Sequence, residues 1–260
     1  MFRLVLVGLL LWSMSTSART ETASQEYVVT VVKGRVATDG NAVGFMEQLK
    51  PTRTIELGTD AQLVLFRFRG AKEYTLTGPG SFVMRADGVV RTSATGALQQ
   101  RAMDPAFSRA APGASLVQAG VTLRAGGAPS RDTPHNGENV APGTPTFRWN
   151  ERPRRGDYEF LLADDRDRVL AVARPAGEEL TLPAVRLAPG AAYRWELRWR
   201  DPTGQMRMAM YRFDTLSADD AATLERLRPQ MDTSGSASIL FGLWLRSVGA
   251  WSLADSYLAP

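Results

Sequence analysis

Short apolar stretches alternate with polar residues through the first third of the chain and predict an all-β module. Turn residues separate these stretches at close, regular intervals, as in a small barrel, roll or solenoid. In a strand expected over residues 62–69, Phe66 and Phe68 fall on one face, because successive side chains point to opposite sides. Arg67 and Arg69 fall on the other. We therefore expect the phenylalanines to point inward and the arginines outward.

The pattern then changes along the chain and predicts four parts. The all-β module extends over residues 27–126. Residues 127–145 are rich in Pro, Gly, Asn and Thr, which is typical of a linker. A second β module follows over residues 146–215, and residues 216–260 have helical spacing. The expected fold class is mainly β, with a small β roll or solenoid, a β-sandwich and a C-terminal α-helical hairpin.

The second module contains the clearest strand of the protein. Tyr193, Trp195 and Trp199 alternate with charged residues and give the strand one aromatic face. At least six short strands in about seventy residues suggest an immunoglobulin-like or fibronectin-like sandwich. We expect the aromatic face to form the core of that sandwich, and the alternative is an exposed platform for a sugar.

The last segment has the features of short helices. Ser217 is suited to cap a helix whose first turn carries two aspartates, and Pro229 closes it. Further apolar helices are expected over residues 239–247 and 252–258. We predict that these helices form an antiparallel pair packed back onto the sandwich.

The N-terminus has the pattern of a secretory signal. Arg3 precedes an apolar run over residues 4–12, and small residues follow as far as Ala18. The run is much shorter than the roughly 20 residues that span a bilayer, which favours cleavage over the alternative of a retained anchor. We expect a periplasmic protein with no stable membrane span after cleavage.

Composition removes several classes of function. The chain has no cysteine and one histidine, which excludes disulfides, thiol nucleophiles and zinc clusters. Its net charge of +4 is small for a nucleic-acid binder. Sequence motifs for nucleotide binding or hydrolytic catalysis are also missing. We therefore expect a protein that is not an enzyme and that uses no cofactor or metal.

Three polar features have ordinary structural interpretations. His135 lies in the predicted linker, where a catalytic base would lack a rigid setting. Asp164, Asp165 and Asp167 suggest calcium, but their spacing and the interspersed arginines favour a solvated hairpin turn. One further feature is a stripe of arginines at positions 194, 198 and 200, which either binds an acidic envelope partner or is a solvated strand face.

The first module contains a series of short motifs with a recognisable pattern. They are Val32-Lys33-Gly34-Arg35-Val36, Leu49-Lys50-Pro51, Ile55-Glu56-Leu57-Gly58-Thr59-Asp60-Ala61, residues 63–68 and Tyr74-Thr75-Leu76-Thr77-Gly78-Pro79-Gly80. Over roughly residues 27–93 the module thereby resembles the FecR domain, named after the periplasmic ferric-citrate sensor of bacteria. Thr52 departs from the pattern, because glycine often follows Lys-Pro in such domains, and Arg69-Gly70-Ala71 replaces a commoner Asp-Gly-Ser.

This resemblance implies a periplasmic, non-enzymatic module that contacts other proteins. The best-known member also passes a signal through the inner membrane. That role requires a cytoplasmic segment and a spanning helix, and only the short predicted signal precedes the domain here. We therefore expect protein contact without transmembrane signalling.

The leading functional hypothesis is a protein-contact scaffold in envelope sensing. The alternative is a carbohydrate- or peptidoglycan-binding structural module, and an enzyme ranks third. Candidate partner-binding residues are Arg67 and Arg69 on the first module and Trp244 and Trp251 on the helices. If the helices form the docking surface, both tryptophans should be partly exposed.

The predicted export can be tested on the secreted chain. N-terminal sequencing of the mature protein should begin at Arg19, because the small-residue exit of the signal ends at Ala18. Recovery of an intact N-terminus in the membrane fraction would instead identify a retained anchor.

Overall fold

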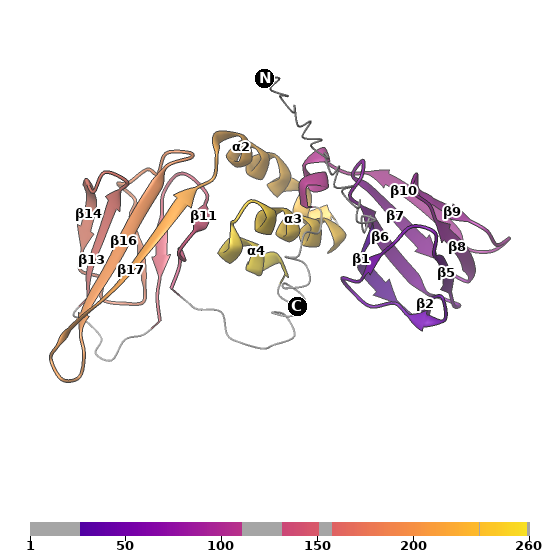
Figure 1. The fold of residues 1–260 in the computed structure, drawn as a ribbon, viewed down its shortest axis with the longest axis horizontal. Coiled ribbons are helices and arrows are strands. Elements are labelled where there is room, and N and C mark those ends of the chain that lie inside the picture. Colours follow the sequence, from indigo (N-terminus) through magenta and orange to yellow (C-terminus); the bar gives the residue numbers. More distant parts are fainter. Residues whose placement is uncertain (1–26, 111–131, 151–157, 234, 259–260) are drawn as a thin grey trace, which may run out of the picture.

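The computed structural model describes residues 27–110, 132–150, 158–233 and 235–258, and its fold is mainly β. The two β modules lie at opposite ends of the molecule, and the C-terminal helices lie between them (Figure 1). The predicted class, several antiparallel sheets followed by helices, is confirmed.

The first module consists of two five-stranded antiparallel sheets. One has the order β10-β7-β6-β1-β4, with bounds β1 (Tyr27–Lys33), β4 (Gln48–Leu49), β6 (Gln62–Arg67), β7 (Lys72–Thr77) and β10 (Ala97–Ala102). The other has the order β3-β2-β5-β8-β9, with bounds β2 (Val36–Thr38), β3 (Asn41–Ala42), β5 (Thr54–Leu57), β8 (Gly80–Met84) and β9 (Val89–Arg91).

The β1–β6 sheet is buried on both faces. Val29 and Leu65 belong to the core of the first module, whereas Val28 and Phe66 belong to a second cluster that includes the C-terminal helices. Because neighbouring side chains point to opposite faces, each strand serves two cores in alternation. Burial on both faces also accounts for the nearly continuous apolar runs in these two strands.

The outward direction predicted for Arg67 was wrong. Arg67 is only 7% exposed, and its Nη1 donates a hydrogen bond to the Asp87 carbonyl oxygen at 2.6 Å. That carbonyl lies in the loop between β8 and β9, which covers this end of the sheet. Phe66 and Phe68 are buried as expected, but in the cluster shared with the helices. Alternation identifies residues that share a face without revealing what covers it.

The second module is a five-stranded sheet packed with a two-stranded one. The larger sheet has the order β11-β17-β16-β13-β14, and the smaller pairs β12 with β15. The bounds are β11 (Glu138–Val140), β12 (Thr146–Arg148), β13 (Glu159–Asp164), β14 (Val169–Ala173), β15 (Glu179–Thr181), β16 (Ala192–Arg200) and β17 (Met206–Thr215).

The aromatic face of β16 forms the core of this module, as predicted. Trp195 is fully buried, with its ring centroid 5.7 Å from that of Phe147 and 6.0 Å from that of Phe160. Tyr193 is also buried, and Trp199 packs against the same cluster. These rings are therefore not an exposed platform for a sugar.

Part of the predicted linker belongs to the second module. β11 pairs in parallel with β17, and the Pro134 carbonyl oxygen accepts a 2.9 Å hydrogen bond from Trp195 Nε1. The buried Asp132 carboxylate accepts hydrogen bonds from the Tyr211 hydroxyl and from the Asn150 N–H. A strand of three residues among prolines and glycines leaves too little alternation to detect in the sequence.

Three helices form the C-terminal group: α2 (Ala218–Leu227), α3 (Gly235–Ser247) and α4 (Trp251–Leu258), with the 3-10 turn η2 (Arg228–Thr233) after α2. The predicted cap is confirmed, since the Ser217 side chain accepts a hydrogen bond from Asp220 N. No helix in the described part of the chain is long and apolar enough to cross a bilayer.

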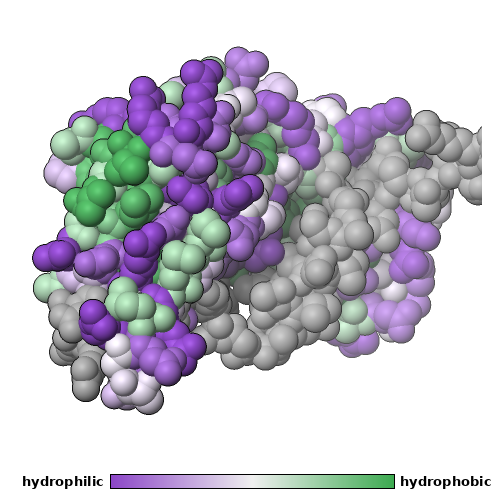
Figure 2. Space-filling view, turned by 60° about the vertical axis from the view of Figure 1, so that its left-hand side comes forward, coloured by the Kyte–Doolittle hydropathy of each residue, from purple (hydrophilic) through white to green (hydrophobic). Residues whose placement is uncertain are grey.

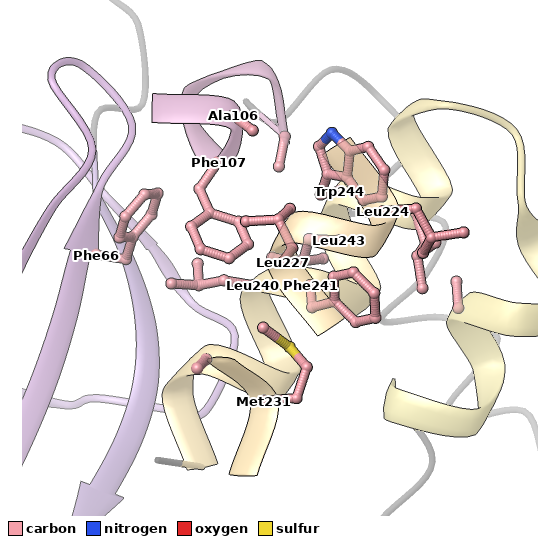
Figure 3. Close-up of a cluster of buried hydrophobic side chains, with 14 of the residues drawn as sticks. Phe66, Ala106, Phe107, Leu224, Leu227, Met231, Leu240, Phe241, Leu243 and Trp244 are labelled. Carbon is pink, nitrogen blue, oxygen red and sulfur yellow. The ribbon is translucent and has the colours of Figure 1, made fainter. Parts of the chain in front are cut away.

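The helices pack on the first module as well as on the second, which differs from the expected packing on the sandwich alone. Leu240 and Trp244 of α3 are fully buried in the cluster that contains Phe66 and Phe107 (Figure 3). Phe107 belongs to the 3-10 turn η1 (Pro105–Ala110), and its ring meets that of Phe66 edge-on at 6.3 Å.

β11 holds the junction between α3 and α4 from the other side. The Asn139 amide donates from Nδ2 to the Val248 carbonyl at 2.8 Å and from its backbone N–H to the Gly249 carbonyl at 2.9 Å. The Glu138 side chain, 2% exposed as a residue, accepts a 2.7 Å hydrogen bond from Ser252 N. One short strand thus satisfies carbonyls beyond the end of α3 and an amide at the start of α4.

The contact between helices and sheet should be a major source of stability. Leu240→Ala should lower the free energy of unfolding by about 2–5 kcal/mol, because it leaves a cavity in a fully buried site. Urea denaturation followed by tryptophan fluorescence measures the change. Ser256→Ala, at an exposed position of α4, is the control and should change it by less than about 0.5 kcal/mol. Equal effects of the two substitutions would contradict a shared core.

Candidate interaction surface

The larger sheet of the second module has one face that no described element covers with an apolar cluster. We call it the outer face, and it consists of side chains opposite to the aromatic core. Its members are Glu159 and Leu161 from β13, Val172 from β14 with Arg174 after it, Arg194, Glu196, Arg198 and Arg200 from β16, and Met206, Met208, Met210, Arg212 and Asp214 from β17.

A row of methionines is the most unusual part of the outer face. Met206, Met208 and Met210 are 49%, 54% and 42% exposed. They occupy alternate positions of one strand, so their side chains point the same way. Val172, 71% exposed, adds apolar surface to the same face, on the edge strand β14. Apolar side chains gathered in this way, rather than scattered singly, mark interaction surfaces.

Charged residues of β16 lie between the methionines and Val172. Glu196 is nearly buried, and its carboxylate pairs with Arg194 at 3.2 Å and with Arg198 at 3.0 Å. Arg198 lies directly opposite Met208 and Arg200 opposite Met206. The outer face therefore combines flexible apolar side chains with a row of guanidinium groups.

The surface of the second module is correspondingly mixed. Figure 2 shows hydrophobic side chains gathered in a patch of this module, with hydrophilic side chains around them. In the first module, the side of the β1–β6 sheet that points away from the core of that module is covered by α3 and η1. Among the described elements, none packs an apolar cluster on the outer face of the second module.

The four predicted partner-binding residues do not come together. Trp244 is fully buried, so the expected partial exposure was wrong for this residue, which fills the helix–sheet cluster instead. Trp251 is 40% exposed at the start of α4. Arg69 is exposed on the first module, whereas Arg67 is buried beneath the β8–β9 loop.

His135 lies in an ordered turn before β11. Its side chain is half-buried, and its backbone N–H donates a 2.8 Å hydrogen bond to the Glu138 carboxylate. The turn therefore helps to position Glu138 for α4. Among the described residues, none forms a hydrogen bond or an ion pair with the imidazole.

The aspartates at the β13–β14 turn are occupied by neighbours within the turn. Asp164 accepts 3.0 Å hydrogen bonds from the backbone N–H groups of Arg166 and Arg168, and Asp167 pairs with Arg194 at 3.1 Å. Desolvation raises the pKa of Asp164, but these hydrogen bonds and the Arg168 charge lower it overall. No metal-binding group of three acidic or histidine side chains occurs among the described residues.

Two shallow cavities, of about 500 and 350 Å³, border this same turn. Both are lined by Asp164, Asp165 and Tyr193. Because the Asp164 carboxylate pairs with Arg168 at 3.0 Å, much of the local charge is already neutralised within the protein. The outer face is the stronger candidate for recognition.

The hairpin between β16 and β17 fixes the relation of the arginines to the methionines. Asp201 accepts hydrogen bonds from the Thr203 hydroxyl at 2.6 Å and from Arg207 Nε at 2.9 Å. The pKa of Asp201 is lowered to about 2, first by the Thr203 side chain and further by Arg207 and the Gln205 backbone, against desolvation that raises it. The ionised carboxylate is thus part of the turn.

Sequence reasoning missed the methionine row, although a signal for it was present. Methionines at 206, 208 and 210 alternate in the strand that follows the turn, opposite in register to the charged face of β16. Since antiparallel partners directly across from each other share a sheet face, a methionine opposite an arginine had to share its outward direction.

Comparison with known proteins gives little further information. No protein-family model matches the chain, and no curated protein matches it. Among solved structures, the crystal structure of CopC from Methylosinus trichosporium OB3b is similar to a part of it, with 20% sequence identity and a TM-score of 0.28. The similarity covers 33% of this chain and 89% of CopC. It is too weak to support any inference about function.

Protonation of Asp201 should weaken the hairpin in acid. Its pKa in the folded protein lies below the ordinary value of 3.8, so the stabilisation is complete above about pH 4 and is lost as the pH falls towards 2. In Asp201→Asn, the free energy of unfolding should depend less steeply on pH in this window than it does in the wild-type protein. Urea titrations of both proteins between pH 2 and 5 provide the comparison, and identical slopes would contradict the assigned role.

Proposed function

We propose that this protein is a non-enzymatic, exported interaction module that binds a protein partner in the bacterial cell envelope. The exposed methionine row of the outer face is the observation that carries this proposal. Methionine side chains are flexible and polarizable, which suits them to contact surfaces of partner proteins. The FecR-like residues of the first module and the signal-like N-terminus support the envelope as the site of action.

The helices support a scaffold role by joining the two β modules. Phe66 of the first module and Leu240 of α3 share one cluster, while Asn139 of the second module is bonded to the carbonyls that follow α3. A partner bound to either module would therefore be held at a defined position relative to the other. No comparable observation favours the carbohydrate-binding alternative, because the aromatic row of β16 lies in the core.

In-cell crosslinking of the tagged full chain tests this proposal. Wild-type protein should yield one reproducible crosslinked envelope protein, and Met208→Glu should lose it, because a charge replaces an apolar contact in the middle of the row. The readout is mass spectrometry of the affinity-purified adducts.

Val90→Glu is the matched control, since Val90 is an apolar residue of β9, 38% exposed, on the first module. It should retain the partner. Sedimentation of the purified protein with peptidoglycan, in the absence of a protein adduct, would contradict the proposal and favour the glycan-binding alternative.

A further inference from the structure

We propose that the partner presents an acidic, amphipathic protein segment, which docks on the outer face at the end formed by Arg198, Arg200, Met206 and Met208. This inference rests on the proposed function and specifies the surface and the chemistry of the partner. The segment would place apolar side chains on the methionines and carboxylates on the two guanidinium groups.

The charges of the outer face are unevenly compensated. Five arginines, at positions 174, 194, 198, 200 and 212, share it with Glu159, Glu196 and Asp214. Glu159 pairs with Arg174 at 3.4 Å, so the β14 side is balanced. Glu196 is shared between Arg194 and Arg198, and Arg194 also pairs with Asp167. Among the described residues, neither Arg200, which lies beyond Arg198 on β16, nor Arg212 on β17 forms an ion pair, and of the two only Arg200 adjoins the exposed methionines Met206 and Met208.

Arg200 has no acidic partner among the described residues. It is exposed, and the hydrogen bond that it makes within the described structure goes from Nη1 to the carbonyl oxygen of Gly204 at 3.1 Å. A neutral carbonyl leaves the positive charge of the guanidinium unpaired. The remaining N–H groups form a planar fork that matches a carboxylate in a two-bond arrangement.

The neighbouring methionines determine what else the partner must provide. Met206 and Met208 lie directly opposite Arg200 and Arg198, so each guanidinium has an exposed thioether beside it. An apolar side chain placed on these methionines excludes water, and an arginine–carboxylate pair beside it becomes stronger as the local dielectric falls. A segment that is acidic but not apolar would not exclude water, so its carboxylates would pair more weakly with the arginines.

An anionic lipid surface fits the same face less well. Glu159 and Glu196 lie within it, and a dense layer of phosphates would repel both carboxylates. A protein segment can instead place single carboxylates at Arg198 and Arg200 and leave the glutamates unopposed. The mixture of positive and negative side chains on β16 therefore favours a protein partner with charges at discrete positions.

Site-specific photocrosslinking in producing cells tests the location. A photoreactive phenylalanine analogue is placed at position 208 in one protein and at position 90 in the matched control. The adduct at 208 should map to a segment rich in Asp or Glu interspersed with apolar residues, and position 90 should not give this adduct.

A synthetic peptide copied from the mapped segment then tests the chemistry. Binding of the fluorescent peptide to the full chain should weaken about tenfold or more in Arg200→Glu, and much less in Arg200→Lys. Arg174→Glu is the matched control, because Arg174 lies on the same face beside Glu159 and should leave affinity within about twofold. Wild-type affinity should also fall as salt is raised. Circular dichroism verifies that each variant is folded.

The outcomes separate this inference from the proposed function. A protein adduct at position 90 alone, a mapped segment without net negative charge, or equal peptide affinities for wild type and Arg200→Glu would overturn the inference and leave the proposed function standing. Adducts only to lipid or glycan, or no protein adduct at either position, would overturn both. Flotation with phosphatidylglycerol vesicles that is lost in Arg200→Glu would identify a lipid surface and also overturn the inference.

Discussion

The packing of α3 against the helix-facing side of the β1–β6 sheet is the contact on which the arrangement of the molecule depends. Val28 and Phe66 do not belong to the core of their own module, because they point to the sheet face opposite to that of their neighbours Val29 and Leu65. Their burial requires a second layer, and α3 provides it with fully buried side chains such as Leu240. Each large apolar side chain buried in this way contributes about 1.5–3 kcal/mol. The helices are thus an integral layer of the first module, although they follow the second in the sequence.

The second module is joined to that layer by hydrogen bonds as well as by apolar contacts, because Leu216 after β17 is buried in the helix cluster and Ala141 after β11 packs against it. Glu138 and Asn139 satisfy backbone groups where α3 ends and α4 begins, and those groups have no partner within a helix. Hydrogen bonds of this kind are directional, so they fix orientation as well as distance. Apolar burial against both modules, with these hydrogen bonds on the side of the second module, positions both sheets around one central element.

Local pattern was sufficient for the elements whose environment is local. Alternation identified the aromatic face of β16, and the residue type of Ser217 identified the start of α2. Prediction failed where distant segments decide the outcome: Arg67 is covered by the β8–β9 loop, and Trp244 by a sheet far earlier in the chain. The outer face was missed for a related reason. Arginines of β16 and methionines of β17 form one surface only through the register across the hairpin, and each strand was considered by itself.

The order of the layers along the chain has a consequence for biogenesis. Thr30 of β1 and Ser236 of α3 are hydrogen-bonded neighbours separated by 206 positions. A polypeptide that emerges with its N-terminus first therefore exposes the residues of β1 and β6 long before their cover has been synthesised. During that interval Phe66 and Phe68 are exposed apolar side chains, and exposed apolar surface promotes aggregation of incompletely folded chains. The apolar core of the first module is therefore complete only once α3 has been synthesised, and a chain truncated before α3 leaves that sheet face without its cover.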